Sequence, residues 1–294
     1  MFTSEVRIQA PAKINLFLSV LGRRDDGYHE IASIMQSVAL YDTLIFTPAP
    51  PRIIEVECPG LNIPPGQNLA YQAAIKLTQL ASVDYGASIR IKKAIPVAAG
   101  LAGGSSDAAA ALMGLNKLWS LSLTYDELYQ VASELGADVP FCLNPGTALA
   151  EGIGAKLTPL QPGRAFWVVL IHPDQQVSTS HIYQSLNLSL TGQGPDIKLM
   201  AAAIKEGDLV SIAANLYNDL EQVTVKQYPF ILSLKRAMVE AGAVGTLMSG
   251  SGPTVFGLAW DKTQATSIAA KLREIVKEKV RIVETYNPNL QQRG

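Results

Sequence analysis

The segment from Ile95 to Asp107 has the composition of a loop that could bind an anion. It reads I-P-V-A-A-G-L-A-G-G-S-S-D, so that glycines and serines precede an alanine-rich run typical of a helix. Glycine lets the backbone turn its N–H groups toward a ligand. The start of a helix adds unpaired N–H groups and the positive end of a dipole. A tight strand-to-helix turn without a ligand has the same composition, so the loop alone leaves both interpretations open.

Two charged residues in apolar surroundings could act on a bound phosphate. Lys13 precedes the apolar run I-N-L-F-L, and Asp138 lies between Ala137 and Val139. A lysine in such a place is often a surface residue with a buried stem, and an aspartate after Gly-Ala is often only a turn residue. The functional interpretation is that Lys13 faces an anion and that Asp138 is a reactive carboxylate.

Two further features could contact a ligand. Tyr28 and His29 stand next to each other at the end of the polar loop Gly22–Glu30, and exposed aromatic residues on a loop can stack on a flat ligand. Near the other end of the chain, S-G-S-G-P at residues 249–253 forms a second glycine-serine turn between two predicted strands. The chain therefore has two glycine-rich turns that could meet one ligand.

The common phosphate-binding signatures are absent. The sequence has no G-x-x-x-x-G-K-[ST], and the loop after Ile95 has no G-x-G-x-x-G. Instead, P-A-K-I-N-L near the start, G-L-A-G-G-S-S-D in the middle and G-S-G-P-T near the end together resemble the three motifs of the GHMP kinase superfamily. That superfamily is named for galactokinase, homoserine kinase, mevalonate kinase and phosphomevalonate kinase. The motifs span nearly the whole chain.

The resemblance implies an α+β fold with two domains and an active site in the cleft between them. The ATP-binding domain would comprise residues 1–160 and the substrate-binding domain residues 161–294, in a monomer or homodimer. G-Y-H at residues 27–29, G-A-D-V-P-F, and V-S-T followed by Tyr183 resemble one branch in particular. Its members use ATP and Mg²⁺ to phosphorylate the 2-hydroxyl of 4-diphosphocytidyl-2-C-methyl-D-erythritol, on the non-mevalonate route to isoprenoid precursors.

The resemblance also implies a role for each matching residue. Asp138 would accept or orient the substrate hydroxyl, while Lys13 would keep Asp138 ionised and neutralise charge on the moving phosphoryl group. Substrate-binding positions would be Asn15, Tyr28, His29, Asp138, Tyr183, Gly250 and Gly252, of which the aromatic residues would hold cytosine. Nucleotide-binding positions would be Asn68, Lys93, Pro96, Gly100, Leu101, Gly103, Gly104, Ser105 and Ser106, with Ser106 as a possible Mg²⁺ ligand.

Two alternatives stay open. The first is another GHMP kinase, acting on mevalonate or homoserine, although a small aliphatic substrate gives the aromatic residues at positions 28, 29 and 183 no stacking partner. The second is a catalytically silent nucleotide-binding protein on the same scaffold, against which Lys13 and Asp138 both speak.

Three alanines mark a departure from the resemblance. Ala98, Ala99 and Ala102 stand where many relatives carry glycine, and a Cβ atom opposes a positive φ. We therefore predict that positive φ values in the loop are confined to its glycines, Gly100, Gly103 and Gly104.

The periodicity of apolar residues predicts the elements that position these residues. In the first half we expect a strand at Val6–Val20 interrupted at Ala10 and Pro11, a strand pair within Ile31–Pro48, and helices at Leu69–Ala81, Asp107–Trp119 and Tyr125–Leu135. Asn68 should cap the first helix, and Thr124 with Glu127 the third. After a boundary at Gln161–Arg164 we expect strands at Ala165–His172, within 245–260 and at Val280–Thr285, and helices from Ser178, at Pro229–Ala241 and at Thr263–Glu278.

Composition limits the remaining function classes. The 294 residues carry 24 Lys plus Arg and 25 Asp plus Glu, so no basic field exists to bind nucleic acid. The two cysteines are far apart and the three histidines form no ligand pair, which argues against a disulfide framework and a zinc site. Neither a signal peptide nor an apolar run of about 18 residues is present. We expect a soluble cytoplasmic protein that acts on a small molecule, without nucleic-acid or membrane partners.

Overall fold

The computed structural model describes residues 4–61, 63–286 and 288, and the chain divides into two compact units. Unit 1 comprises residues 1–12, 40–97 and 102–144, and unit 2 comprises residues 13–39, 98–101 and 145–294. Each of the two long strands, β1 (Val6–Arg23) and β2 (His29–Ala49), supplies residues to both units. Neither unit is one continuous stretch of the chain, because each takes its residues from three segments.

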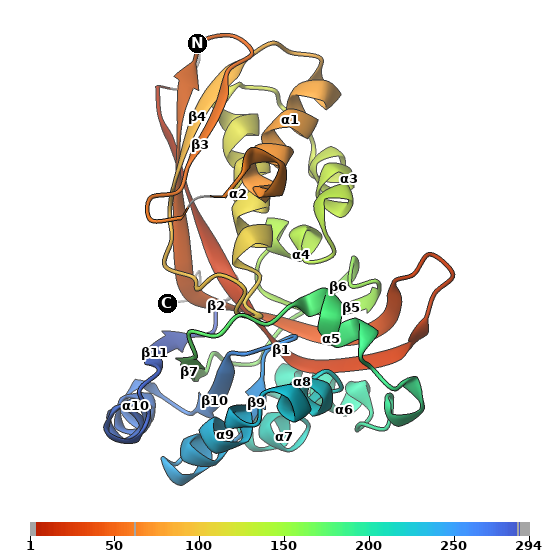
Figure 1. Cartoon of the computed structure of the whole chain (residues 1–294), viewed down its shortest axis with the longest axis vertical. Helices are drawn as coiled ribbons and strands as arrows, with labels where there is room; N and C mark the ends of the chain where they lie inside the picture. The colour runs from red at the N-terminus through yellow and green to blue at the C-terminus, as the bar shows by residue number, and fades with distance from the viewer. Residues whose placement is uncertain (1–3, 62, 287, 289–294) are drawn as a thin grey trace. The chain divides into compact units, whose positions relative to one another are not determined.

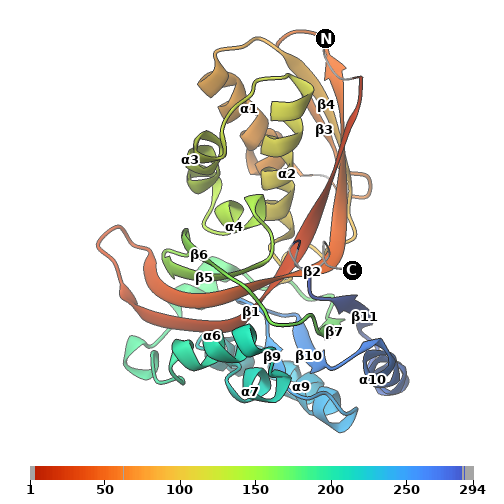
Figure 2. The ribbon, with the colours of Figure 1, turned by 180° about the vertical axis from the view of Figure 1, so that it is seen from behind.

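Unit 1 combines a strand layer with a group of helices. Residues Thr43–Ala49 of β2 pair antiparallel with β4 (Gly86–Lys92), which pairs in parallel with β3 (Ile54–Glu57). Beside these strands, α1 and α2 pack against each other (Figures 1 and 2). The helices of this unit are α1 (Leu69–Ala81), α2 (Gly103–Leu118), α3 (Tyr125–Leu135) and α4 (Val139–Leu143), and Pro65–Gln67 forms the short 3-10 helix η1.

Two predicted helix starts in unit 1, those of α1 and α3, are confirmed by their caps. The Asn68 side chain accepts hydrogen bonds from the N–H groups of Ala70 and Tyr71, and α1 has the predicted bounds. Thr124 and Glu127 form the reciprocal capping box, and α3 also begins and ends as predicted. These caps satisfy N–H groups that the helix itself leaves unpaired, which is why short sequence patterns suffice to locate them.

Unit 2 contains an antiparallel sheet in the order β11-β7-β10-β9. These strands are β7 (Trp167–His172), β9 (Thr246–Met248), β10 (Val255–Ala259) and β11 (Lys279–Glu284), close to the predicted ranges. Helices α9 (Phe230–Glu240) and α10 (Lys262–Ile275) contact this sheet (Figure 2). Apolar residues of the sheet and of both helices share one buried cluster that includes Ile171, Ile231 and Ile268.

The rest of unit 2 surrounds the parts of β1 and β2 that belong to it. Residues Ile31–Gln36 of β2 pair with β5 (Thr147–Gly152), which continues to β6 (Lys156–Leu160). Phe17 and Leu18 of β1 pair in parallel with β8 (Tyr217–Asn218). The remaining helices are α5 (Thr179–Gln184), α6 (Ile197–Glu206), α7 (Leu209–Ala214), α8 (Glu221–Gln227) and the 3-10 helix η2 (Leu188–Leu190).

Three predicted element boundaries are wrong. Strand β1 continues through Ala10 and Pro11, and the Pro11 carbonyl, which lies in that strand, accepts the hydroxyl hydrogen of Ser106. Strand β2 is one strand instead of a pair, because it exchanges one antiparallel partner, β5, for another, β4, along its length. Helix α2 begins at Gly103 and not at Asp107, so the glycines and serines of the loop form its first turn.

The prediction about the loop alanines is also wrong. Ala98 and Ala102 have φ values of 52° and 55°, as Gly100 does at 74°, whereas Gly103 and Gly104 are helical. Such a conformation costs an alanine roughly 1 to 2 kcal/mol. At Ala102 it reverses the chain immediately before α2, and the Ala102 carbonyl then accepts the first-turn N–H of Ser106 at 2.9 Å. The connection to the helix imposes the strain, and a methyl group is small enough to tolerate it.

We expect Gly114→Ala to destabilise unit 1 by about 1 to 3 kcal/mol, since overpacking outweighs the better helix propensity of alanine. A Cβ atom at position 114 would lie 2.3 Å from the fully buried Phe46 ring. Gly104→Ala in the same helix is the matched control, because its Cβ would meet only Leu69 Cδ1 at 3.8 Å. Urea unfolding measures both free energies, and equal stability of the two variants would contradict the packing argument.

Candidate functional site

Residues from three distant motifs meet in unit 2. The backbone N–H of Lys13 donates to the Leu101 carbonyl at 3.1 Å, and the Ser249 hydroxyl donates to the Gly100 carbonyl at 2.8 Å. A Cβ atom on Gly100 would lie 2.1 Å from the Ser249 carbonyl oxygen, so no other residue fits there. A Cβ on Gly250 would lie 3.3 Å from the Gly100 carbonyl oxygen and 3.5 Å from Asn15 Oδ1. The loop segment 98–101 is therefore held between the first motif and the third.

The turn at 249–253 is held by hydrogen bonds to Asn218 on β8 and Glu221 at the start of α8. The buried Asn218 amide group donates to the carbonyls of Met248 and Gly250, both at 2.8 Å. The Glu221 carboxylate accepts the Met248 N–H at 2.8 Å. With their positive φ values of 56° and 85°, Gly250 and Gly252 let the turn follow these anchors. Sequence reasoning missed Asn218, because a single asparagine outside any motif carries no local signal.

Lys13 and Asn15 are buried side by side on β1. The Lys13 ammonium donates to Asn15 Oδ1 at 2.7 Å, and Asn15 Nδ2 lies 2.9 Å from the Ser33 hydroxyl on β2. The exposed fractions are 5% for Lys13 and 1% for Asn15. Alternation along a strand places residues i and i+2 on one face, so the spacing P-A-K-I-N itself brings the two side chains together.

Two of the three predicted aromatic residues contact each other. The rings of His29, at the start of β2, and Tyr183, on α5, have centroids 5.1 Å apart and are tilted by 34°. Tyr28 is 59% exposed. Burial lowers the pKa of His29, and the charge of Arg23 lowers it further. The imidazole is therefore neutral near pH 7 and can both donate and accept a hydrogen bond.

A group of three charged side chains lies at the base of the loop in unit 1. The Lys93 ammonium binds the carboxylates of Asp42, on β2, and Asp107, on α2, the latter at 2.7 Å. The other Asp42 oxygen accepts the N–H groups of Ala94 and Ile95, at 2.6 and 2.9 Å. The group thus ties the exit of β4 to both β2 and α2. Asp42 was missed as a site residue, although a carboxylate within the apolar strand V-A-L-Y-D-T-L-I-F is a signal that could have found it.

Asp107 is the group's least satisfied member. Its Oδ1 has no hydrogen-bond partner among the described residues. Burial raises the pKa of Asp107 to about 7, the ammonium of Lys93 opposes this shift, and the charge of Asp42 adds to it. Burial alone would lower the pKa of Lys93, but the carboxylates of Asp107 and Asp42 outweigh it and raise that pKa.

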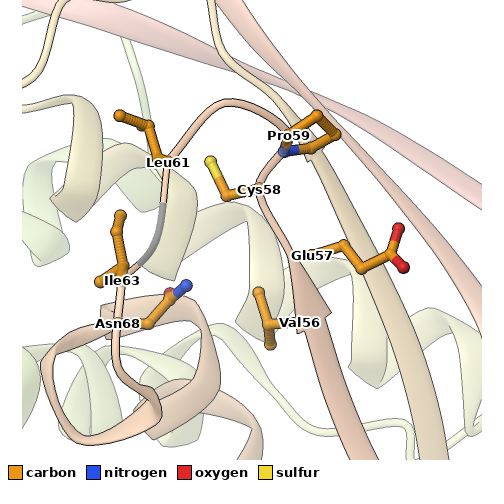
Figure 3. Close-up of a pocket in the computed structure, with 7 residues that line it drawn as sticks. All are labelled: Val56, Glu57, Cys58, Pro59, Leu61, Ile63 and Asn68. Atoms are coloured by element: carbon orange, nitrogen blue, oxygen red, sulfur yellow. The ribbon is translucent and has the colours of Figure 1, made fainter.

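Asn68 borders a pocket of about 400 Å³ in unit 1. Its lining residues are Val56, Glu57, Cys58, Pro59, Leu61, Ile63 and Asn68, with the Glu57 carboxylate directed away from the other side chains (Figure 3). Although most of these residues are of apolar type, the surface they expose to the pocket is mostly polar. Burial raises the pKa of the free Cys58 thiol, and the charges of Lys93, Asp107 and Asp42 also act on it. The pocket is therefore within electrostatic range of the charged group at the loop base.

The other predicted nucleotide positions belong to the loop and the first turn of α2. Gly103 and Ser105 are half-buried and Gly104 is exposed, whereas Pro96 is half-buried just after β4. The buried Ser106 hydroxyl donates to the Pro11 carbonyl at 2.7 Å, which leaves only its lone pairs for a metal ion. Asp138 is half-buried and immediately precedes α4, where its carbonyl accepts the Cys142 N–H at 3.3 Å.

The described part of the chain contains neither a metal-binding cluster of side chains nor a membrane-spanning helix. Within residues 4–61, 63–286 and 288, no group of three or more His, Cys, Asp and Glu side chains is arranged to hold a metal ion. In the same part of the chain, no helix has the length and apolar character needed to cross a membrane.

Comparison with known proteins places the chain. The model of the GHMP kinases N terminal domain matches residues 68–146, and that of the GHMP kinases C terminal matches residues 200–278. The chain belongs to the GHMP kinase family. It is 48% identical to a 4-diphosphocytidyl-2-C-methyl-D-erythritol kinase of Pelotomaculum thermopropionicum, over 96% of this chain and 98% of that protein. The protein of that name from Alkaliphilus oremlandii is 46% identical, covering 96% and 97%.

Solved structures of GHMP kinases share the fold. A crystal structure of 4-(cytidine 5'-diphospho)-2C-methyl-D-erythritol kinase superimposes with a TM-score of 0.82 at 32% identity, covering 96% of this chain and 100% of that one. The mevalonate kinase of L. major, in complex with R-mevalonate, has a TM-score of 0.76 at 17% identity, covering 98% and 99%. At that lower identity the likeness shows the fold alone.

The raised pKa of Asp107 predicts how the stability of this GHMP kinase depends on pH. Its pKa of about 7 in the folded chain exceeds its ordinary value of 3.8, so folding favours the protonated form. That contribution is present at low pH and is lost as the pH rises through the folded pKa. We expect the free energy of unfolding of the wild type, minus that of Asp107→Asn, to fall from about pH 5 to about pH 7, by at most about 1.4 kcal/mol per pH unit.

Urea unfolding across this pH range checks the expectation. Asp84→Asn is the control, because the hydrogen bond from Arg52 lowers the pKa of that exposed carboxylate and its titration lies below the range. Parallel stability curves for the wild type and Asp107→Asn would show that Asp107 does not titrate there.

Proposed function

We propose that this GHMP kinase transfers the γ-phosphoryl group of ATP to the 2-hydroxyl of 4-diphosphocytidyl-2-C-methyl-D-erythritol, giving ADP and the 2-phosphate. The names of relatives that match the chain almost from end to end support this activity. The observation that carries it is the joining of the three motifs in unit 2 around Gly100, in the same unit as the His29–Tyr183 pair. A phosphate-binding loop and a pair of rings suited to a base are what this substrate requires.

The residues of unit 1 fit a nucleotide. The pocket beside Asn68 has a volume of about 400 Å³, within the range of small-molecule sites. We assign the adenine to this pocket, with Asn68 and Lys93 on its polar side. The phosphates are assigned to the loop from Gly100 to Ser106, because the first turn of α2 begins within it and offers unpaired N–H groups to an anion.

The reaction assigns one task to each of two side chains. As the substrate oxygen forms its bond to the γ-phosphorus, the bond from phosphorus to the ADP oxygen breaks and the hydroxyl proton passes to the Asp138 carboxylate. The Lys13 ammonium, oriented by Asn15, offsets negative charge on the transferred group. Phosphoryl transfer depends mainly on such positioning and charge neutralisation.

Mg²⁺ is proposed as the metal that accompanies ATP. It prefers oxygen ligands, keeps several waters and takes much of its coordination from substrate phosphates, so no cluster of protein carboxylates is needed. Of this chain's residues, Ser106 is the proposed ligand, through its hydroxyl lone pairs.

Tyr28, His29 and Tyr183 are proposed to bind the cytosine of the substrate, a small molecule. We also propose that the protein works in the cytoplasm, because a sequence with only two cysteines, far apart along the chain, suits a reducing compartment. Oligomeric state enters no step of the reaction.

The product test decides the proposed function. The protein is incubated with Mg²⁺-ATP and, separately, the cytidyl substrate, mevalonate and homoserine, and the phosphorylated products are identified by mass spectrometry. We expect phosphate only on the cytidyl substrate. Asp138→Asn should lower kcat by at least about a hundredfold with nearly unchanged ATP binding, since general-base groups contribute on that scale. Phosphorylation of mevalonate or homoserine alone would refute the assignment, and near-normal turnover of Asp138→Asn would remove Asp138 from the mechanism.

Tyr183→Ala tests the cytosine assignment. A stacking contact with a base is worth about 1 to 3 kcal/mol, so we expect KM for the cytidyl substrate to rise by about five- to 150-fold with little change in KM for ATP. Tyr183→Phe is the matched control, because it keeps the ring that contacts His29. Steady-state kinetics with each substrate varied in turn measures both constants. A rise in KM for ATP alone would show that the assignment of Tyr183 to the cytosine is wrong.

A further inference from the structure

A buried serine is hydrogen-bonded to Asn15, which in turn binds Lys13. Ser33 lies on β2, is fully buried, and its hydroxyl is 2.6 Å from the Phe17 carbonyl and 2.9 Å from Asn15 Nδ2. We propose that Ser33 is a positioning residue that fixes which end of the Asn15 amide faces Lys13. The proposal rests on the function assigned above, because it concerns the placement of the ammonium that acts on the phosphoryl group.

Hydrogen counting determines the orientation of the amide. A carbonyl oxygen can only accept, so the single hydrogen of the Ser33 hydroxyl goes to Phe17. The hydroxyl then has only lone pairs left, and the Asn15 atom beside it must be the NH₂ group, which donates. The Asn15 oxygen is consequently the end that lies 2.7 Å from the Lys13 ammonium. Without Ser33, only the Lys13 ammonium, itself a donor, would favour the oxygen end of the amide, and the NH₂ group at the other end would lose its acceptor.

The burial of the chain gives that choice a large effect. Ser33, Asn15 and Lys13 are 0%, 1% and 5% exposed, so water offers little competition for their hydrogen bonds. An unmatched polar group in such surroundings costs about 1 to 3 kcal/mol. If the amide turned, its NH₂ group would face the ammonium and two donors would oppose each other. The ammonium would then move away from the position that Asn15 Oδ1 now sets.

A second buried serine on the same strand supplies a control. Ser37 lies on the same strand, is 1% exposed, and its hydroxyl accepts the Gly146 N–H at 3.1 Å. Ser37→Ala therefore removes a buried hydroxyl of equal size from β2 without touching the bonds to Asn15 and Lys13. A purely structural role for Ser33 predicts that the two alanine variants behave alike.

Steady-state kinetics of Ser33→Ala, Ser37→Ala and Ser33→Thr tests the proposal, with thermal unfolding measured for each. We expect Ser33→Ala to lower kcat by about tenfold or more, with both KM values within about twofold of the wild type. Ser33→Thr keeps the hydroxyl and should restore most of kcat, while Ser37→Ala should keep kcat near that of the wild type. If Ser33→Ala does not fold, Ser33→Cys replaces it, because a thiol of similar shape is a weak donor and acceptor. Equal kcat values for Ser33→Ala and Ser37→Ala would overturn the proposal.

Lys13→Met separates this inference from the proposed function. If Lys13→Met turns over at the wild-type rate, the role of Lys13 is wrong and Ser33 positions nothing of consequence. If Lys13→Met is inactive while Ser33→Ala matches Ser37→Ala, only the Ser33 proposal is overturned. Loss of kcat in Lys13→Met and Ser33→Ala, with recovery in Ser33→Thr, supports both.

Discussion

The close approach of two backbones at Gly100 and Ser249 is the constraint on which the arrangement of motifs in unit 2 depends. Any side chain at position 100 would overlap the Ser249 carbonyl, and the Ser249 hydroxyl in turn holds the Gly100 carbonyl. Leu101, the next residue, accepts the backbone N–H of Lys13. One loop segment thus contacts both the first and the third motif, and these contacts hold the backbone of the loop in place.

Buried polar groups provide the rigidity of both candidate sites. The Asn218 amide group donates to Met248, just before the 249–253 turn, and to Gly250 within it, and Asp42 uses both carboxylate oxygens at the base of the loop. In a low-dielectric interior, satisfied groups of this kind favour one arrangement strongly, since each broken bond leaves a costly orphan. Asp107 Oδ1 is the exception among the described residues, because it has no hydrogen-bond partner. The other oxygen of Asp107 binds Lys93, a residue that we assign to the nucleotide site.

Sequence patterns predicted the parts of the fold that local forces decide. The caps at Asn68 and Thr124 and the bounds of α1 and α3 depend on residues within one turn of each other. Strand alternation also places Lys13 and Asn15 on one face of β1, although no pattern predicted the hydrogen bond between them. Patterns failed where distant partners decide: β2 stays continuous because it changes partner, and Ala98 and Ala102 take positive φ values although neither is glycine.

The sequence by itself determined the family, through three motifs that are recognised by their residues and their order along the chain. It also supplied the residues that we propose to bind the substrates. Only the tertiary structure decided which groups support them. Ser33, Asp42 and Asn218 lie 18, 51 and 30 positions from the residues they bind, Asn15, Lys93 and Met248. No periodicity encodes such distances, because a hydrogen bond between remote segments exists only after packing has brought them together and excluded water. The motifs thus indicate the type of reaction, and the buried hydrogen-bond partners position the motif residues.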